Sequence, residues 1–145
     1  MTTLVSAATG AICAALQASP AVATQVARVR MRPLAANTAT AVVVRPAGAQ
    51  AGAQQINGMP IQWACQIAVE CYAKATTATP PDVAVDALVA ATYARLMADE
   101  ATLAGAVGLI TPAEITYDFD VDGEATACAT LLFTVRQTAN NPSVF

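Results

Sequence analysis

Residues 115–136 alternate between apolar and polar side chains, and this pattern constrains the fold more than any other feature of the chain. A period of two is that of a β-strand with one buried face. Asp122-Gly123 divides the segment, and Asp-Gly is a preferred type I′ turn dipeptide because both central residues need a positive φ. The segment therefore predicts a C-terminal β-hairpin with an acidic solvent face. The apolar face of its first strand consists of Ile115, Tyr117, Phe119 and Val121.

The same residues match the start of a calcium-binding loop, since Asp118, Asp120, Asp122 and Gly123 follow the D-x-D-x-D-G pattern of an EF-hand. An EF-hand also needs a bidentate Glu at the twelfth loop position, which here is Ala129. It needs a helix on each side, whereas the flanks of this segment have the period of strands. We therefore expect the three aspartates to form an acidic row on a sheet and to bind no metal ion.

The composition excludes several kinds of chemistry. No histidine occurs among the 145 residues, which removes Ser-His-Asp and Cys-His catalysis and histidine-ligated metals. The chain has no phosphate-binding glycine motif. Its net charge of −3 argues against nucleic-acid binding as the main task, because neutralising phosphates needs a basic surface. We expect a protein that is not an enzyme and that uses no cofactor.

The four cysteines form no Cys-x-x-Cys pair, so neither a zinc site nor a redox motif is indicated. Cys65 and Cys71 fall on the same face of one predicted strand, about 20 Å apart at the usual rise, which is too far for a disulfide. We expect reduced, partly buried thiols, as in a cytosolic protein.

The first half of the chain predicts a helix followed by two strands. Residues 3–18 have apolar side chains at helical spacing, and the polar and proline residues 17–20 interrupt the apolar run too early for a membrane span. Ser19-Pro20 predicts a further short turn of helix. Residues 26–33 and 41–45 predict strands, the second of them stopped by Pro46.

Residues 46–59 are rich in Gly, Ala and Gln and predict a long loop or a flexible hairpin arm ending at Asn57-Gly58. Residues 61–74 alternate as a long strand, with Trp63 on the apolar face as a core anchor. Thr79-Pro80 predicts the start of a helix that runs to about residue 98, with Thr79 as its N-cap.

After this helix, Asp99 is expected to cap a short helix that runs through residue 106, and residues 138–145 form a frayed polar tail. The predicted order is therefore α-β-β-loop-β-α-β-β, in a single domain over residues 1–145. Such an order is typical of an α+β fold, with a mostly antiparallel sheet covered by helices.

Arg28, Arg30 and Arg32 fall on one face of the strand predicted over residues 26–33. Three like charges on one strand face repel one another, so an offsetting partner is expected. The row of Asp118, Asp120 and Asp122 is the evident complement. The two rows either pair on adjacent strands or meet across a contact between copies. Solvation of the arginines and contact with a nucleic-acid backbone are the alternatives.

One further acidic pair lies on the predicted second helix. Asp82 and Asp86 are one helical turn apart, and we interpret them as part of a solvated helix face.

The whole-chain pattern resembles the tail terminator proteins of long-tailed bacteriophages, of the minor tail protein U type. The segments that carry the resemblance are the helix of residues 4–18 with Ser19-Pro20, the Arg-containing strand, the Gly/Gln loop, the strand of residues 62–72, the helix of residues 80–98 and the hairpin of residues 115–136.

The resemblance implies a structural virion protein that forms a homohexameric ring on the tail tube, stops tube polymerisation and presents a surface to the head–neck connector. It also implies that the charged strands and the long loop, with Gln50, Gln54 and Gln55, make the ring and tube contacts. A closed heterologous ring would explain complementary charge rows on one chain.

Two other functions stay open at this point. A head–tail connector or neck protein would form a ring of different valence or bind the DNA-filled portal. A small ligand-binding α+β domain would be a monomer or dimer with a deep pocket lined by acids of perturbed pKa. Neither a membrane nor a specific nucleic-acid sequence is an expected partner.

Overall fold

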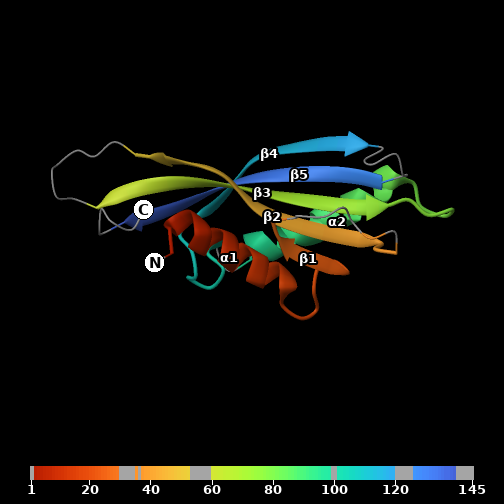
Figure 1. Ribbon diagram of the computed structural model, residues 1–145, viewed down its shortest axis with the longest axis horizontal. Coiled ribbons are helices and arrows are strands. Elements are labelled where there is room, and N and C mark those ends of the chain that lie inside the picture. Colours follow the sequence, from red (N-terminus) through yellow and green to blue (C-terminus); the bar gives the residue numbers. More distant parts are fainter. Residues whose placement is uncertain are drawn as a thin grey trace.

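The computed structural model describes residues 2–29, 35, 37–52, 60–98, 101–119 and 126–139, which form two helices and a five-stranded sheet (Figure 1). The elements are α1 (Leu4–Gln17), β1 (Gln25–Arg28), β2 (Thr40–Ala51), β3 (Ile61–Lys74), α2 (Pro81–Met97), β4 (Ile110–Phe119) and β5 (Thr126–Ala139). The sheet order is β1-β2-β3-β5-β4, and only the β1–β2 pair is parallel. The predicted α+β class and the mostly antiparallel sheet are confirmed.

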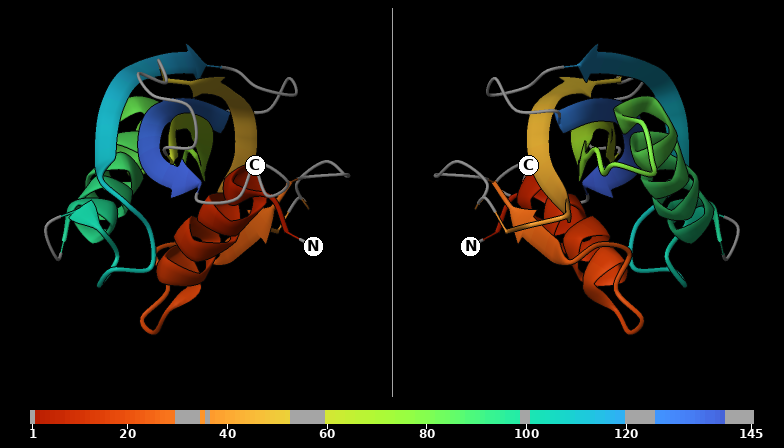
Figure 2. Two further views of the ribbon diagram at one scale, coloured as in Figure 1. Left: turned by 90° about the vertical axis from the view of Figure 1, so that its left-hand side faces the viewer. Right: turned by 90° about the vertical axis from the view of Figure 1, so that its right-hand side faces the viewer.

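Both helices pack on the same face of the sheet, and the main core lies between them and the strands. From α1, the fully buried Ala8, Ile12 and Leu16 contribute at helical spacing. From β5, alternate residues such as Leu131 and Phe133 point to the same side. Figure 2 shows the sheet strongly twisted above the two helices. This face is called the helix-covered face below.

The first strand is shorter than expected. β1 ends at Arg28, and Val29 adopts a left-handed conformation with φ of 53°. A β-branched residue in that region is a genuine departure from strand geometry. The prediction of a strand continuing from residue 26 through Val29 is therefore wrong. Residues 30–34 lie outside the described part of the chain.

The second strand is longer than expected, because Pro46 does not stop it. β2 continues to Ala51 and pairs with β3 throughout, with a register shift between Pro46 and Gly48. On its other side, β1 pairs only as far as Val44. From Pro46 onward β2 is thus an edge strand, where a residue without an N–H is tolerated. The prediction of a loop is wrong for residues 46–51, whereas the alternative of a hairpin arm agrees with the antiparallel pairing of this segment with β3. Residues 53–59, which include the turn expected at Asn57-Gly58, lie outside the description.

The helix boundaries depart from expectation in three places. Ser19-Pro20 forms a bend with a cis peptide bond and not a turn of helix. α2 begins at Pro81 with Pro80 at the cap position, so Thr79 is not the N-cap. Residues 102–106 form turns, with Leu103 and Ala104 at positive φ, so the short helix expected there is absent. Asp99, its expected cap, is not described.

The C-terminal hairpin is confirmed, with a register that differs from the expected turn. A two-residue turn at Asp122-Gly123 would pair Tyr117 with Cys128. The structure instead pairs Tyr117 with Ala129, which places apolar residues of both strands on one face. Burial of an apolar face is a strong determinant of register, because a slip of one residue reverses every side chain. The turn itself lies outside the described residues. β5 runs to Ala139, so the expectation of a frayed tail is wrong for residues 138 and 139. Residues 140–145 lie outside the description.

Candidate functional site

Arg28 lies at one edge of the sheet, on the helix-covered face. It pairs with Val44 of β2, whose side chain belongs to the main core, so both residues face the same side. The Nη2 atom of Arg28 donates a hydrogen bond of 2.6 Å to Ser6 Oγ of α1. The side chain is nevertheless exposed. Arg30 and Arg32 lie outside the described residues, so their expected position beside Arg28 is not described.

Asp118 lies at the other edge and on the other face. It pairs with Cys128 of β5, which belongs to the small buried cluster on the face opposite the helices. Three strands separate β4 from β1 in the sheet order. The prediction that the two charge rows pair on adjacent strands is therefore wrong for Arg28 and Asp118. Asp120 and Asp122 are not described. A contact between copies stays a hypothesis.

Among the described residues, the two sheet edges carry opposite charges, with Arg28 and Arg45 on β1 and β2 and with Glu114 and Asp118 on β4. Residues 1–69 contain four arginines and no acid, whereas residues 70–145 contain all ten acids and three basic residues. The first half supplies α1, β1 and β2 at one edge, and the second half supplies β5 and β4 at the other. We call these the basic edge and the acidic edge. The sequence already shows this asymmetry, as the unequal distribution of acidic and basic residues between the two halves of the chain.

The acidic edge carries exposed aromatic side chains. Tyr117 and Phe119 are 48 % and 50 % exposed, and their rings stack with centroids 6.3 Å apart. They lie on the helix-covered face, but α2 packs over β3 and β5 more than over β4. Both faces of β4 from Thr111 onward are thus exposed, and not only the acidic one expected from the alternation.

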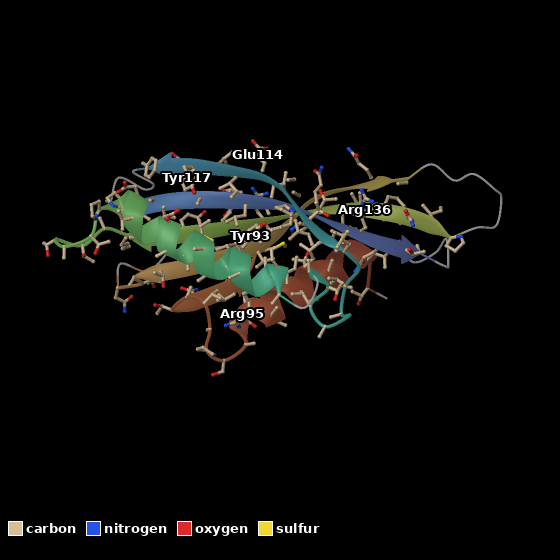
Figure 3. All side chains as sticks on the ribbon, turned by 180° about the vertical axis from the view of Figure 1, so that it is seen from behind. Tyr93, Arg95, Glu114, Tyr117 and Arg136 are labelled. Carbon is tan, nitrogen blue, oxygen red and sulfur yellow. The ribbon has the colours of Figure 1, made fainter. Side chains whose placement is uncertain are left out.

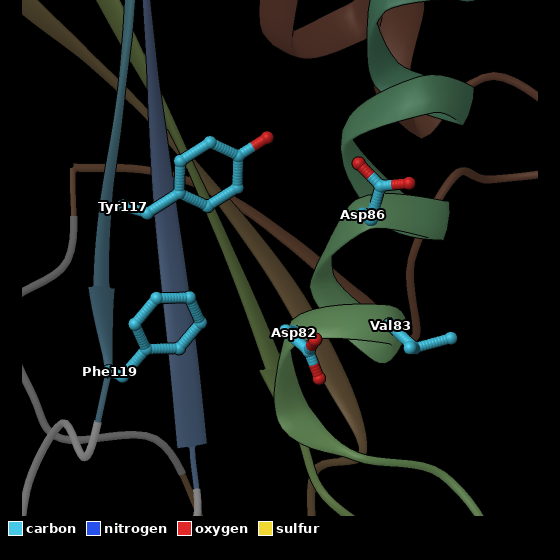
Figure 4. Close-up of a pocket in the computed structure, with 5 residues that line it drawn as sticks. All are labelled: Asp82, Val83, Asp86, Tyr117 and Phe119. Atoms are coloured by element: carbon cyan, nitrogen blue, oxygen red, sulfur yellow. The ribbon is translucent and has the colours of Figure 1, made fainter.

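An open groove of about 430 Å³ lies between α2 and β4. Figure 4 shows Tyr117 and Phe119 on one wall, opposite Asp82 and Asp86 on α2. Both carboxylates are exposed, as the interpretation of a solvated helix face requires. Val83 completes the lining. The alternation of β4 predicted the apolar side chains, but not that α2 would leave them uncovered.

Gln50 lies on the edge segment of β2 beyond Pro46, where it is exposed and pairs with Ala64 of β3. This part of the sheet lies at one end of the long axis of the molecule (Figure 1). Gln54 and Gln55, the other candidate contact residues, lie in the undescribed stretch. The structure therefore places one of the three glutamines on an accessible strand.

A charged network occupies the face opposite the helices. Arg45 Nε donates to Glu70 Oε1 at 2.6 Å, and the Tyr72 hydroxyl donates to Glu70 Oε2 at 2.8 Å. Arg45 is half exposed, so the pair contributes little on its own in water. Because Glu70 is engaged on both carboxylate oxygens, we assign this cluster a structural role.

All four cysteines are free and buried, which confirms the expectation for Cys65 and Cys71. Both belong to the main core, and Trp63 packs against it as the expected anchor. Burial raises the pKa of the Cys71 thiol to about 12, although its hydrogen bond to Thr92 Oγ1 acts in the opposite direction. A thiol that stays protonated is a poor nucleophile.

Cys71 is expected to make the fold sensitive to alkaline pH. The unfolded chain releases this proton near the ordinary thiol pKa of about 9, whereas the native chain keeps it to about pH 12. Stability is therefore full below about pH 9 and falls as the pH rises. Between about pH 8 and pH 11, the melting temperature should fall more steeply for the wild type than for Cys71→Ala. Equal slopes would show that Cys71 does not contribute.

The chain offers little else that indicates a ligand. Within the described ranges, no group of three or more Cys, Asp or Glu side chains is placed to hold a metal ion. No helix in the same ranges is long and apolar enough to cross a membrane. No protein-family model and no curated protein sequence matches this chain. The two oppositely charged edges and the groove are therefore the features that point to a function.

Proposed function

We propose that this chain is a structural protein that associates head to tail into a closed ring, and that the ring is a bacteriophage tail terminator. The observation that carries the proposal is the separation of charge between the two edges of one sheet. A heterologous ring needs two different, complementary patches on each subunit, one for each neighbour. The basic and acidic edges are such a pair of patches.

The exposed side chains of the acidic edge support an interface in preference to a solvated surface. Aromatic residues are enriched in protein interfaces and often carry much of the binding energy. Ile115, Tyr117 and Phe119 are each more than two-fifths exposed on one strand. The neighbouring carboxylates would steer a basic partner towards this surface and fix its orientation.

The identity of the ring rests on the resemblance to tail terminators. In this proposal six copies close the ring in the virion tail, and one ring face caps the tube while the other meets the head–neck connector. The paired ends of β2 and β3, which carry Gln50, lie at one end of the molecule and are the proposed contact with the tube (Figure 1).

Tube capping tests this function directly. Purified tail-tube protein of the same phage is polymerised with and without this chain, and tube lengths are measured by electron microscopy. We expect shorter tubes that carry a ring at one end. Tubes of unchanged length without end density would contradict the proposed function, whatever the oligomeric state of the chain.

A further inference from the structure

We infer that the groove between α2 and β4 receives the basic edge of a second copy, so that Asp82 and Asp86 are the acidic partners of Arg28. This inference rests on the proposed ring and identifies the contact that closes it. It replaces Asp118, the partner suggested by the row pattern, with two residues on a helix.

The basic edge and the groove lie on the same face of the sheet. Arg28 lies on the helix-covered face at the basic edge, and Tyr117 and Phe119 lie on that face at the acidic edge. In a ring whose sheets follow one another around the axis, a single rotation relates neighbours, so every sheet presents the same face to the same side. The basic edge of one copy then meets the groove side of the next. Asp118 points to the opposite face.

The side chains of the groove fit a guanidinium group. An arginine stacks on aromatic faces and forms charge-assisted hydrogen bonds with carboxylates. The groove offers both, because the stacked rings of Tyr117 and Phe119 lie opposite Asp82 and Asp86 (Figure 4). A lysine-rich or neutral partner would use only part of this arrangement.

Among the residues that the structure describes, Arg28, Asp82 and Asp86 have no ion-pair partner. In the same ranges, Arg45 and Glu70 do form an ion pair. Arg28 bonds to a serine hydroxyl. A neighbouring copy would supply the missing charge to each side.

A charge-exchange experiment tests the contact. Arg28→Glu makes the basic edge acidic, and Asp86→Arg makes the groove basic. Light scattering should show the ring mass for the wild type and the single-chain mass for each variant alone. An equimolar mixture of the two variants should regain the ring mass, because each altered surface then finds its opposite and six subunits can alternate. Phe119→Ala should also reduce the ring fraction.

Asp118→Arg provides the matched control, since it makes the same charge change on the other face of β4. We expect it to retain the ring. If Asp118→Arg complements Arg28→Glu and Asp86→Arg does not, the inference is overturned while the ring survives. Rings formed by both Arg28→Glu and Asp86→Arg alone would also overturn it. A wild type that never exceeds the single-chain mass would overturn the proposed function as well. Thermal melting of each variant shows whether it is folded.

Discussion

Gly108→Ala is expected to lower the melting temperature by roughly 10 °C, which corresponds to about 3 kcal/mol of overpacking in a domain of this size. Gly108 precedes β4, and its backbone lies beside Arg136 of β5, whose N–H donates to the carbonyl oxygen of Leu109 at 3.0 Å. A Cβ atom at this position would overlap the carbonyl oxygen of Arg136, and it would lie 2.9 Å from the carbonyl carbon of the same residue. Both contacts are backbone atoms of a paired strand, so no side-chain rotation relieves them. The cost therefore falls on the β4–β5 pairing.

Gly10→Ala is the matched control, because it adds the same methyl group inside α1. The nearest atom there is Arg28 Nη1 at 3.6 Å, an ordinary contact, and alanine favours a helix interior by up to about 1 kcal/mol over glycine. We expect this variant to melt at or above the wild-type temperature. Equal melting temperatures for Gly108→Ala and the wild type would show that the backbones of Gly108 and Arg136 are farther apart than the structure has them.

Arg95→Met is expected to cost about 2 kcal/mol, the usual range for hydrogen bonds made by a charged group. Arg95 reaches from α2 to the end of α1, where it donates to the carbonyl oxygens of Ala15, Ala18 and Pro20 at 3.1, 3.2 and 2.8 Å. Figure 3 shows it on α2, on the side away from Tyr117. The last carbonyls of a helix lack partners within the helix, so Arg95 satisfies groups that would otherwise need water.

Urea unfolding measures this effect. Arg95→Lys keeps the positive charge but removes the planar guanidinium group, so it separates the contribution of the charge from that of the hydrogen-bond geometry. An ammonium group does not reproduce the planar fork that reaches three carbonyls, so the lysine variant should lie between the wild type and methionine. Coincident unfolding midpoints for the wild type and Arg95→Met would show that the hydrogen bonds from Arg95 to the end of α1 do not stabilise the fold.

The elements that the sequence predicts well are those with a long, regular period. β3 has the expected bounds at both ends, because fourteen residues alternate without interruption. α1 differs from expectation by one residue at each end. One of the errors arises where Pro46 was taken as the end of a strand. Pro46 lies within β2, at a position where β2 is an edge strand, and edge position is a property of the sheet that a local pattern does not contain.

The relation between Arg28 and Asp118 shows the same limit over a longer distance. The sequence places both charges on strands, but the order β1-β2-β3-β5-β4 inserts three strands between them. Their opposite faces follow from the pairing of Arg28 with Val44 and of Asp118 with Cys128. Pairing between strands far apart in sequence depends on the packing of the whole sheet, so local alternation gives the face of a residue only relative to its own strand.

The groove was missed for a related reason. The sequence gives the residues of the groove two separate interpretations. It predicts a solvated helix face for Asp82 and Asp86, and it predicts the apolar side of a hairpin strand for Tyr117 and Phe119. The proximity of the two pairs arises because α2 crosses the sheet short of its edge strand. The unequal distribution of acids between the two halves of the chain was the available signal, since it indicates that any self-association is between unlike surfaces.

The mass of the purified protein in solution tests the central claim of head-to-tail association most directly. Light scattering over a range of protein and salt concentrations should show a species of roughly six times the 14.7 kDa of one chain. This species should lose subunits as salt rises, because the proposed contact joins exposed charges. A mass of 14.7 kDa at every protein and salt concentration would contradict the account.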